Sequence, residues 1–321
     1  MQRNNLHLLW MLVVLAACQD PIVPVSTYID SPAEPQDYLQ RIIFQDPDTG
    51  YIVGGQRFDK TLVMRTVDGG ENWEQLAMFD QFTFILFDVL TKENMVLGAG
   101  LGGLRLMSQD AGTNWSLRHT NGIKAIRSMV MIEDSVLIGV GGLGYNKGEI
   151  LQSEDFGFSW TIVDTPEVEL RDLHFSDDRT GYACGYGVVY KTKDGGDSWT
   201  LTPAKDDFFS SIHFPSPNVG YTVGRTGTIL KTEDAGDSWE KLRNGNSPLV
   251  PRHLYNHVTF LDVNTGYILG DKGVFLKTTD GGLSWQTLDL DIEADLLHGY
   301  FFQEGEGLLV GSQGTIVRFR E

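Results

Sequence analysis

The sequence has few cysteines, few basic residues and little proline relative to glycine. Only two of its 321 residues are cysteine, and the first is expected to be modified, so the mature chain has one free thiol and no internal disulfide. The 25 Lys and Arg are outnumbered by 43 Asp and Glu, giving a net charge of −18. This balance argues against nucleic acid as a partner, because neutralising phosphates requires clustered bases. With 37 glycines and 11 prolines, the composition favours short strands joined by tight turns.

The first 18 residues resemble the leader of a bacterial lipoprotein. Arg3 supplies a positive charge and an apolar stretch follows over residues 6–17, which is shorter than the ~20 residues that a spanning helix needs. The ending Leu15-Ala16-Ala17-Cys18 resembles the lipobox, in which the cysteine sulfur is acylated and the signal peptide is removed before it. We therefore expect residues 1–17 to be a signal peptide and the protein to be anchored in the cell envelope through Cys18, outside the cytoplasm. An ordinary secretory signal is the alternative.

A repeat of about forty residues covers most of the remaining chain. Six segments share the pattern Ser/Thr-x-Asp-x-Gly-x-x-Trp, and each tryptophan after the leader ends one of them. The aspartate and tryptophan pairs are Asp68 and Trp73, Asp110 and Trp115, Asp155 and Trp160, Asp194 and Trp199, Asp234 and Trp239, and Asp280 and Trp285. Repeats of this period indicate an array of similar supersecondary units.

A second pattern precedes the first, in which a glycine closes a short apolar strand. It is clearest in Gly181-Tyr-Ala-Cys-Gly185 and Gly266-Tyr-Ile-Leu-Gly270, and looser copies end at Gly98, Gly139 and Gly311. Counting these elements gives seven units, each with four short strands and with the aspartate turn between the third and fourth. The sequence therefore predicts an all-β fold, a single seven-bladed β-propeller with four-stranded antiparallel blades, over residues 37–321.

The six aspartate turns match the Asp-box, and their register resembles that of the photosystem II stability and assembly factor family. The resemblance extends over residues 38–321 and is carried by segments such as residues 264–278, Asn-Thr-Gly-Tyr-Ile-Leu-Gly-Asp-Lys-Gly-Val-Phe-Leu-Lys-Thr. It implies a non-enzymatic envelope protein that assists a membrane complex or an unfolded client. A single propeller usually holds a protein, peptide or glycan on one face, around the central channel.

We expect the Asp-box residues to be structural. A carboxylate in such a turn can accept backbone N–H groups that would otherwise be unpaired, and the tryptophan can cover the turn. Catalysis would need these aspartates to converge, whereas one per blade spreads them around the rim.

The seventh unit ends at Glu321 after its third strand, which leaves an edge to be covered. We predict that residues 22–29, with Val23, Val25, Thr27 and Tyr28, supply the missing outer strand. Residues 18–36 would then be a lipidated tether and closing strand.

Histidines and arginines cluster near the predicted first strands, which lie nearest the channel. His174, His213, His253, His257 and His298 lie in or beside these strands in blades four to seven, and Arg127 and Arg171 occupy similar positions, with Arg41 and Arg252 nearby. Packing between blades or solvated surface would explain them. The functional interpretation is a binding mouth formed by Arg41, Arg127, Arg171, Arg252, His257 and His298. No spacing supports a metal site, and we expect no cofactor.

Enzymatic interpretations have weaker support. Gly98–Gly103 and Gly139–Gly144 fit the dinucleotide pattern G-x-G-x-x-G, but strands follow both, so hairpins are the better account. Cys184 lies within an apolar strand, as a buried inert thiol would. Sialidases share the Asp-box, but residues 38–43 lack the proline and adjacent aromatic of their arginine motif. A glycan-binding or glycoside hydrolase propeller is the alternative to a protein-binding scaffold.

Overall fold

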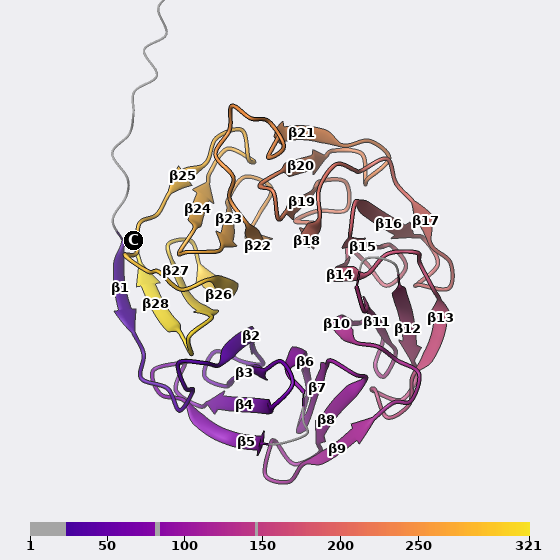
Figure 1. Ribbon diagram of the computed structural model, residues 1–321, viewed down its shortest axis with the longest axis vertical. Coiled ribbons are helices and arrows are strands. Elements are labelled where there is room, and N and C mark those ends of the chain that lie inside the picture. Colours follow the sequence, from indigo (N-terminus) through magenta and orange to yellow (C-terminus); the bar gives the residue numbers. More distant parts are fainter. Residues whose placement is uncertain (1–23, 81–83, 145–146) are drawn as a thin grey trace, which may run out of the picture.

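The computed structural model describes residues 24–80, 84–144 and 147–321. These residues form 28 strands in seven four-stranded antiparallel sheets, and none of them lies in a helix. The sheets are arranged as blades in a ring around a common axis (Figure 1). The prediction of a seven-bladed propeller is therefore confirmed. The leader, Cys18, Ile22 and Val23 lie outside the described residues.

Six blades follow one another along the chain, each running from an inner strand to an outer one. They consist of β2 (Tyr38–Phe44), β3 (Gly50–Gln56), β4 (Lys60–Thr66) and β5 (Glu74–Asp80); β6 (Leu86–Lys92), β7 (Met95–Gly100), β8 (Leu104–Ser108) and β9 (Ser116–His119); β10 (Ile126–Met131), β11 (Leu137–Gly142), β12 (Gly148–Ser153) and β13 (Thr161–Asp164); β14 (Leu170–Phe175), β15 (Gly181–Gly185), β16 (Val188–Thr192) and β17 (Thr200–Leu201); β18 (Phe209–His213), β19 (Gly220–Gly224), β20 (Ile229–Thr232) and β21 (Glu240–Arg243); β22 (Tyr255–Phe260), β23 (Gly266–Gly270), β24 (Phe275–Thr278) and β25 (Gln286–Thr287).

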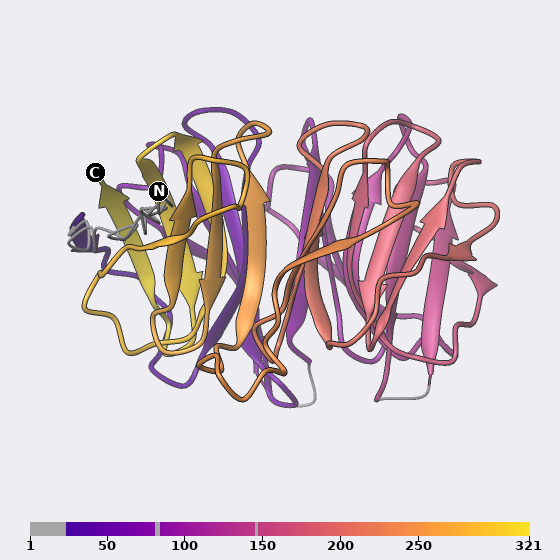
Figure 2. The same cartoon turned by 90° about the horizontal axis from the view of Figure 1, so that it is seen from above.

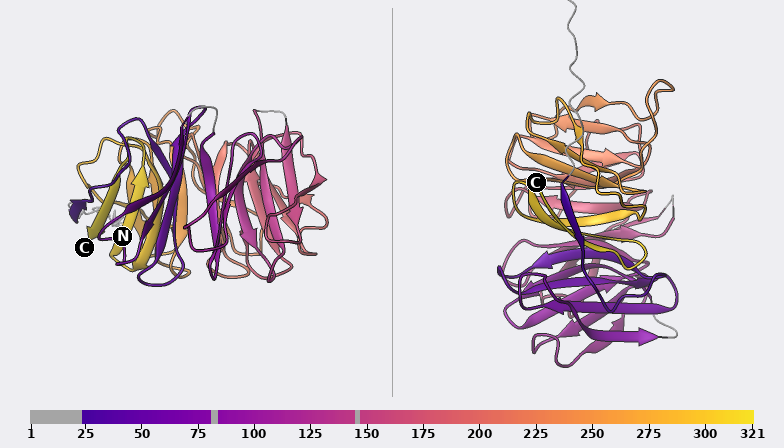
Figure 3. Two further views of the ribbon diagram at one scale, coloured as in Figure 1. Left: turned by 90° about the horizontal axis from the view of Figure 1, so that it is seen from below. Right: turned by 90° about the vertical axis from the view of Figure 1, so that its left-hand side faces the viewer.

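Blade seven is built from both ends of the described chain. Its inner strands are β26 (Leu296–Gln303), β27 (Glu306–Gly311) and β28 (Ile316–Arg320), and its outer strand is β1 (Val25–Tyr28). β1 lies antiparallel to β28, with Val25 opposite Arg320 and Tyr28 opposite Val317. The two strands run side by side at the edge of the ring (Figures 1 and 3). Closure by an N-terminal strand is thus confirmed.

The Asp-box turns join the third and fourth strands of the blades, as predicted. In the first, the Thr66 hydroxyl donates to Asp68 at 2.8 Å and accepts the Gly70 amide at 2.9 Å. Asp68 also accepts the Asn72 amide at 3.0 Å, and hydrogen bonds from Asn72 lower the pKa of Asp68 to about 2. Five further turns repeat these bonds, so each box ties its own loop together.

The tyrosine of the Gly-Tyr pattern connects neighbouring blades. The Tyr182 hydroxyl donates to the Ala235 carbonyl at 2.8 Å, and Ala235 lies in the Asp-box of the next blade. Across the strand pair, Lys191 lies opposite Tyr182 and holds its ammonium 5.7 Å from the ring centroid. The two repeated motifs therefore contact each other across the blade interface.

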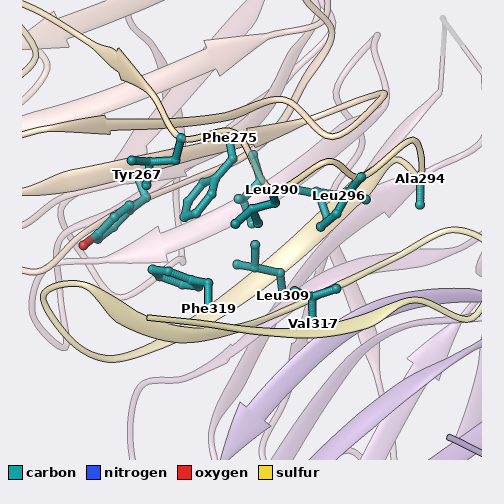
Figure 4. Packing of buried hydrophobic residues seen from close by; sticks show 11 residues of the cluster. Tyr267, Phe275, Leu290, Ala294, Leu296, Leu309, Val317 and Phe319 are labelled. Atoms are coloured by element: carbon teal, nitrogen blue, oxygen red, sulfur yellow. The ribbon is translucent and has the colours of Figure 1, made fainter. Parts of the chain in front are cut away.

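The core lies between adjacent blades. Tyr267 and Phe275 of blade six pack with Leu309 and Phe319 of blade seven, and all four side chains are fully buried (Figure 4). Burying a side chain of this size contributes about 2 kcal/mol.

The predicted hairpins are confirmed, but two closing glycines were misplaced. Both G-x-G-x-x-G stretches lie in the β7–β8 and β11–β12 strand pairs. In strand register, however, Gly100 and Gly141 occupy the place of Gly54, two residues after the predicted Gly98 and Gly139. Gly98 and Gly139 lie inside their strands. The prediction was wrong because these strands contain more than one glycine that could close the pattern.

Candidate functional site

The inner strands begin on one face of the disc and end on the other. Because the third strand of a blade runs parallel to the first, the Asp-box turns lie where the inner strands end. Figure 2 shows the strands running between these two faces. We call the face where the inner strands begin the mouth face and the opposite one the Asp-box face.

Every inner strand carries a β-bulge near its start. The register shifts by one residue in all seven blades, so that one residue in each is left without a partner in the ladder. These bulge residues are Gln40, Phe87, Arg127, Arg171, Ser210, Asn256 and Leu297, and all seven line a depression of about 160 Å³ at the channel. We call this depression the mouth.

The closing glycines of the Gly-Tyr pattern make room for these bulges. A Cβ atom on Gly54 would lie 2.0 Å from the Tyr38 carbonyl oxygen, and one on Gly185 would lie 2.2 Å from that of Glu169. Both carbonyls precede a bulge by two residues. A larger residue at these positions would therefore collide with the backbone that shapes the mouth.

A second ring lies one residue further along each inner strand. It consists of Arg41, Asp88, Ser128, Asp172, Ser211, His257 and His298. Arg41 of blade one pairs with Asp88 of blade two at 3.0 Å, and its Nη1 lies 3.9 Å from Asp172 of blade four. Asp172 accepts the hydroxyls of Ser128 and Ser211, at 3.1 and 2.8 Å. The floor of the mouth is thus a polar network that links blades across the channel.

Two pairs of histidine rings line the channel. His257 and His298 have ring centroids 4.0 Å apart, and those of His174 and His213 are 4.8 Å apart. Burial lowers the pKa of His298 well below its usual value, with further contributions from His257 and Arg41. The His298 Nδ1 atom is buried and has no hydrogen-bond partner among the described residues. His253 instead stacks beside Tyr255 in a separate pocket between blades five and six.

The arginines of the mouth are ion-paired and stacked. Arg127 and Arg171 both contact Glu169, at 2.9 and 3.2 Å. Arg127 also lies over the Phe87 ring at 4.0 Å from its centroid, and burial lowers the pKa of Arg127 to about 10. Arg171 stacks on Tyr186 and donates to its hydroxyl at 3.2 Å.

Five of the six predicted mouth residues line this depression together. They are Arg41, Arg127, Arg171, His257 and His298. Arg252 is exposed in the connection before β22 and is not among the lining residues. The mouth is also lined by Phe87, Tyr186, Phe208 and Arg225, which were not predicted from the sequence. The register of the Gly-Tyr pattern was the signal that could have located Phe87, which is itself a bulge residue.

Metal-binding groups are not gathered in one place among the described residues. No three His, Cys, Asp or Glu side chains among them are grouped to hold a metal ion. Cys184 is fully buried in β15, and burial raises the pKa of its thiol. Asp207 is engaged with the hairpin between β19 and β20, accepting the amides of Thr226 and Thr228.

The described part of the chain includes no helix with the length and apolar character needed to cross a membrane.

Comparisons with known proteins point to one family. The family model described as photosynthesis system II assembly factor YCF48 matches residues 27–126, 153–253 and 248–320. A curated relative, the photosystem II assembly lipoprotein Ycf48 of Synechococcus sp. (strain CC9902), is 26% identical over 191 residues, or 54% of this chain. The match spans only 53% of that relative, about half its length.

Solved structures show the same fold. A structure described as YCF48 bound to D1 peptide aligns with a TM-score of 0.73 at 19% identity, covering 94% of this chain and 97% of the other. YCF48 from Cyanidioschyzon merolae gives 0.71 at 19% identity, with 92% and 98% covered. The WD40 propeller of Doa1 gives 0.68 at 11% identity, covering 94% and 98%, so the architecture reaches beyond the family. The family model matches most of the length of this chain, and the chain therefore belongs to the YCF48 family of Asp-box propellers.

Proposed function

We propose that this protein is a non-enzymatic assembly scaffold that holds a polypeptide segment of a client protein at the mouth. The observation that carries the proposal is the ring of seven bulges, which places Arg127, Arg171 and Phe87 in a single depression at the channel. Guanidinium groups donate hydrogen bonds to carbonyl and carboxylate oxygens, and aromatic rings cover apolar side chains. Peptide segments offer both kinds of group.

Two relatives support a polypeptide ligand. One is named as an assembly lipoprotein of photosystem II, and the other is described with a bound D1 peptide. From these relatives we take only the class of partner, a polypeptide. The client of this protein is to be identified by experiment.

We further propose that the protein is attached to an envelope membrane by acylation of Cys18. The sequence Leu15-Ala16-Ala17-Cys18 and the lipoprotein name of the relative support this. Two acyl chains suffice for stable anchoring. Replacing Cys18 with Ser should move the protein from the membrane fraction to the soluble extracytoplasmic fraction. Unchanged membrane attachment would contradict the anchor without affecting the proposal for the mouth.

The floor of the mouth favours binding over glycosidase chemistry. Asp88 and Asp172 flank Arg41, and both accept hydrogen bonds from groups of the inner strands. A glycosidase needs one carboxyl group that donates a proton and a second that acts as base or nucleophile. Carboxylates already used as acceptors around one arginine are poorly arranged for that division of roles.

Site-specific cross-linking in native membranes tests the scaffold proposal. A photoreactive residue in place of Phe208, at the mouth, should capture a defined protein, whereas one in place of Leu283, on the Asp-box face, should not. Replacing both Arg127 and Arg171 with Ala should abolish the product. Arg179→Ala is the matched control, because Arg179 is exposed on the Asp-box face. Equal capture from both faces, or capture unaffected by the double variant, would contradict the proposal.

A further inference from the structure

One buried carboxylate lies between the two arginines of the mouth. Glu169 immediately precedes β14, and its side chain is 2% exposed. Its Oε1 atom accepts from Arg127 at 2.9 Å and from Arg171 at 3.2 Å. Its Oε2 atom accepts the Gly144 amide at 3.0 Å. Glu169 is therefore fixed from three directions and can itself fix both guanidinium groups.

Each of the two guanidinium groups that Glu169 contacts also lies over an aromatic ring. Arg127 lies over Phe87, and Arg171 lies over Tyr186. The Phe208 ring packs edge-on to Tyr186 at 4.7 Å, which extends the row into blade five. We call Phe87, Arg127, Arg171, Tyr186 and Phe208 the rail. Its residues come from four consecutive blades, and all five line the mouth.

The mouth is rich in arginine but carries little net charge. Arg41 pairs with Asp88, Arg225 pairs with Asp271, and Arg127 and Arg171 share Glu169. Arg57 and Asp295 both line an adjoining depression, and Asp172 lines the mouth itself. The five arginines that line these two depressions are thus matched by five carboxylates that pair with them or line the same depressions. A ligand gains little from charge alone here, and more from the direction of the guanidinium N–H groups and from stacking.

We propose that Glu169 is the positioning residue of the mouth, which holds Arg127 and Arg171 flat against their aromatic partners. The rail then recognises an extended polypeptide segment by directed hydrogen bonds to its oxygens and by stacking, not by net positive charge. This inference rests on the proposed function for the class of ligand. The positioning role itself can be tested without any client.

The first experiment measures the arginine side chains by NMR. In the wild-type protein the Nε–H signals of Arg127 and Arg171 should show restricted motion and slow exchange, unlike that of Arg179. Glu169→Gln should make both mobile while leaving Arg225 unchanged, and Glu167→Gln is the matched control because Glu167 is exposed two residues earlier. If Arg127 is as mobile as Arg179 in the wild-type protein, the positioning role is wrong whether or not the variant folds.

The second experiment uses fluorescein-labelled hexaglutamate as a probe of net charge. The wild-type protein should bind it weakly, with little change between about 50 and 300 mM NaCl. Glu169→Gln removes the shared negative charge, so affinity for the probe should rise roughly threefold and become sensitive to salt. Tight, strongly salt-dependent binding by the wild-type protein would overturn the recognition mode. If only the cross-linking experiment fails, the proposal of a client at the mouth is wrong, whereas the positioning role of Glu169 still stands.

Discussion

The hydroxyl of Tyr221 donates to the carbonyl oxygen of Gly281 at 2.9 Å, across the interface between blades five and six. Gly281 belongs to the Asp-box of blade six, and Tyr221 belongs to the Gly-Tyr pattern of blade five. Tyr182 makes the same bond to Ala235 one interface earlier. At the following interface the Gly305 amide donates to Tyr267. At the interfaces made by Tyr182 and Tyr221, the two sequence repeats are therefore two halves of one contact.

Replacing Tyr221 with Phe should destabilise the protein by about 1 to 2 kcal/mol, because a buried carbonyl loses its donor while the ring remains. The melting temperature should fall by a few degrees. Tyr28→Phe is the control, since Tyr28 is 59% exposed in β1. Equal melting temperatures for the two variants would mean that this hydroxyl contributes nothing to the blade interface.

Removing residues 20–30 should lower the melting temperature markedly, because β28 would lose the partner that closes the ring. The deletion would remove the hydrogen bonds between β1 and β28. It would also remove the hydrogen bond that the Ile29 amide donates to the Ile316 carbonyl at 3.0 Å. Since most β1 side chains are exposed, the backbone pairing dominates this contribution. We expect a drop of at least about 5 °C in calorimetry, and aggregation through the uncovered edge.

A deletion limited to residues 20–23 is the matched control for ring closure, because it leaves β1 in place. It should melt close to the full-length protein. If the two deletions melt together, the stability of the ring does not depend on β1.

The fold could be predicted because its determinants are local and repeated. Each Asp-box forms within one turn, as the bonds among Thr66, Asp68 and Gly70 show, so six copies specify six similar connections. The missing outer strand in blade seven followed from counting, since the last unit stops after three strands. Only the glycine-rich strands β7 and β11 misled the register, because extra glycines offered two positions for one pattern.

The mouth could be predicted only in part, because its bulge residues occupy the same position in each inner strand but are of different amino-acid types. The seven bulge residues range from Leu297 to Arg127, so no residue type marks them and only the register of the closing glycines could locate them. Polar residues near inner strands led to Arg41 and His298, whereas Phe87 gave no such signal. Glu169 acts through arginines in its own and the preceding blade, a tertiary relationship that the repeat does not encode. Arg252 is near the strand in sequence but belongs to the connection that precedes it.

Acid should weaken the Asp-box turns in a defined pH range. Hydrogen bonds from Ser238 lower the pKa of Asp234 to about 2 in the folded protein, against 3.8 ordinarily. A lowered carboxyl pKa stabilises the fold above the ordinary value, and this contribution is lost as the pH falls from about 4 towards 2. Asp234→Asn should therefore flatten the fall in melting temperature over this range. Asp178→Asn, an exposed change on the same face, is the control, and an equal slope in both variants would contradict the assignment.

The paired channel histidines should make stability depend on pH in a separate and higher range. Burial lowers the pKa of His298, and the neighbouring His257 and Arg41 lower it further. Below about pH 6.5 the unfolded chain binds protons that folded His298 does not, so stability is complete above this pH and declines as the pH falls. The facing carboxylate of Asp172 acts in the opposite sense on His257, whose pKa burial also lowers.

His298→Gln should remove part of this decline, because an amide fills the site without titrating. Each histidine that stays neutral contributes a slope approaching about 1.4 kcal/mol per pH unit below pH 6.5. Urea unfolding from about pH 7.5 to about pH 4.5 measures this slope above the range in which the Asp-box carboxylates titrate. His119→Gln is the control, since His119 is exposed at the end of β9. A slope that changes equally in both variants, or in neither, would show that the channel histidines do not set the acid sensitivity of the fold.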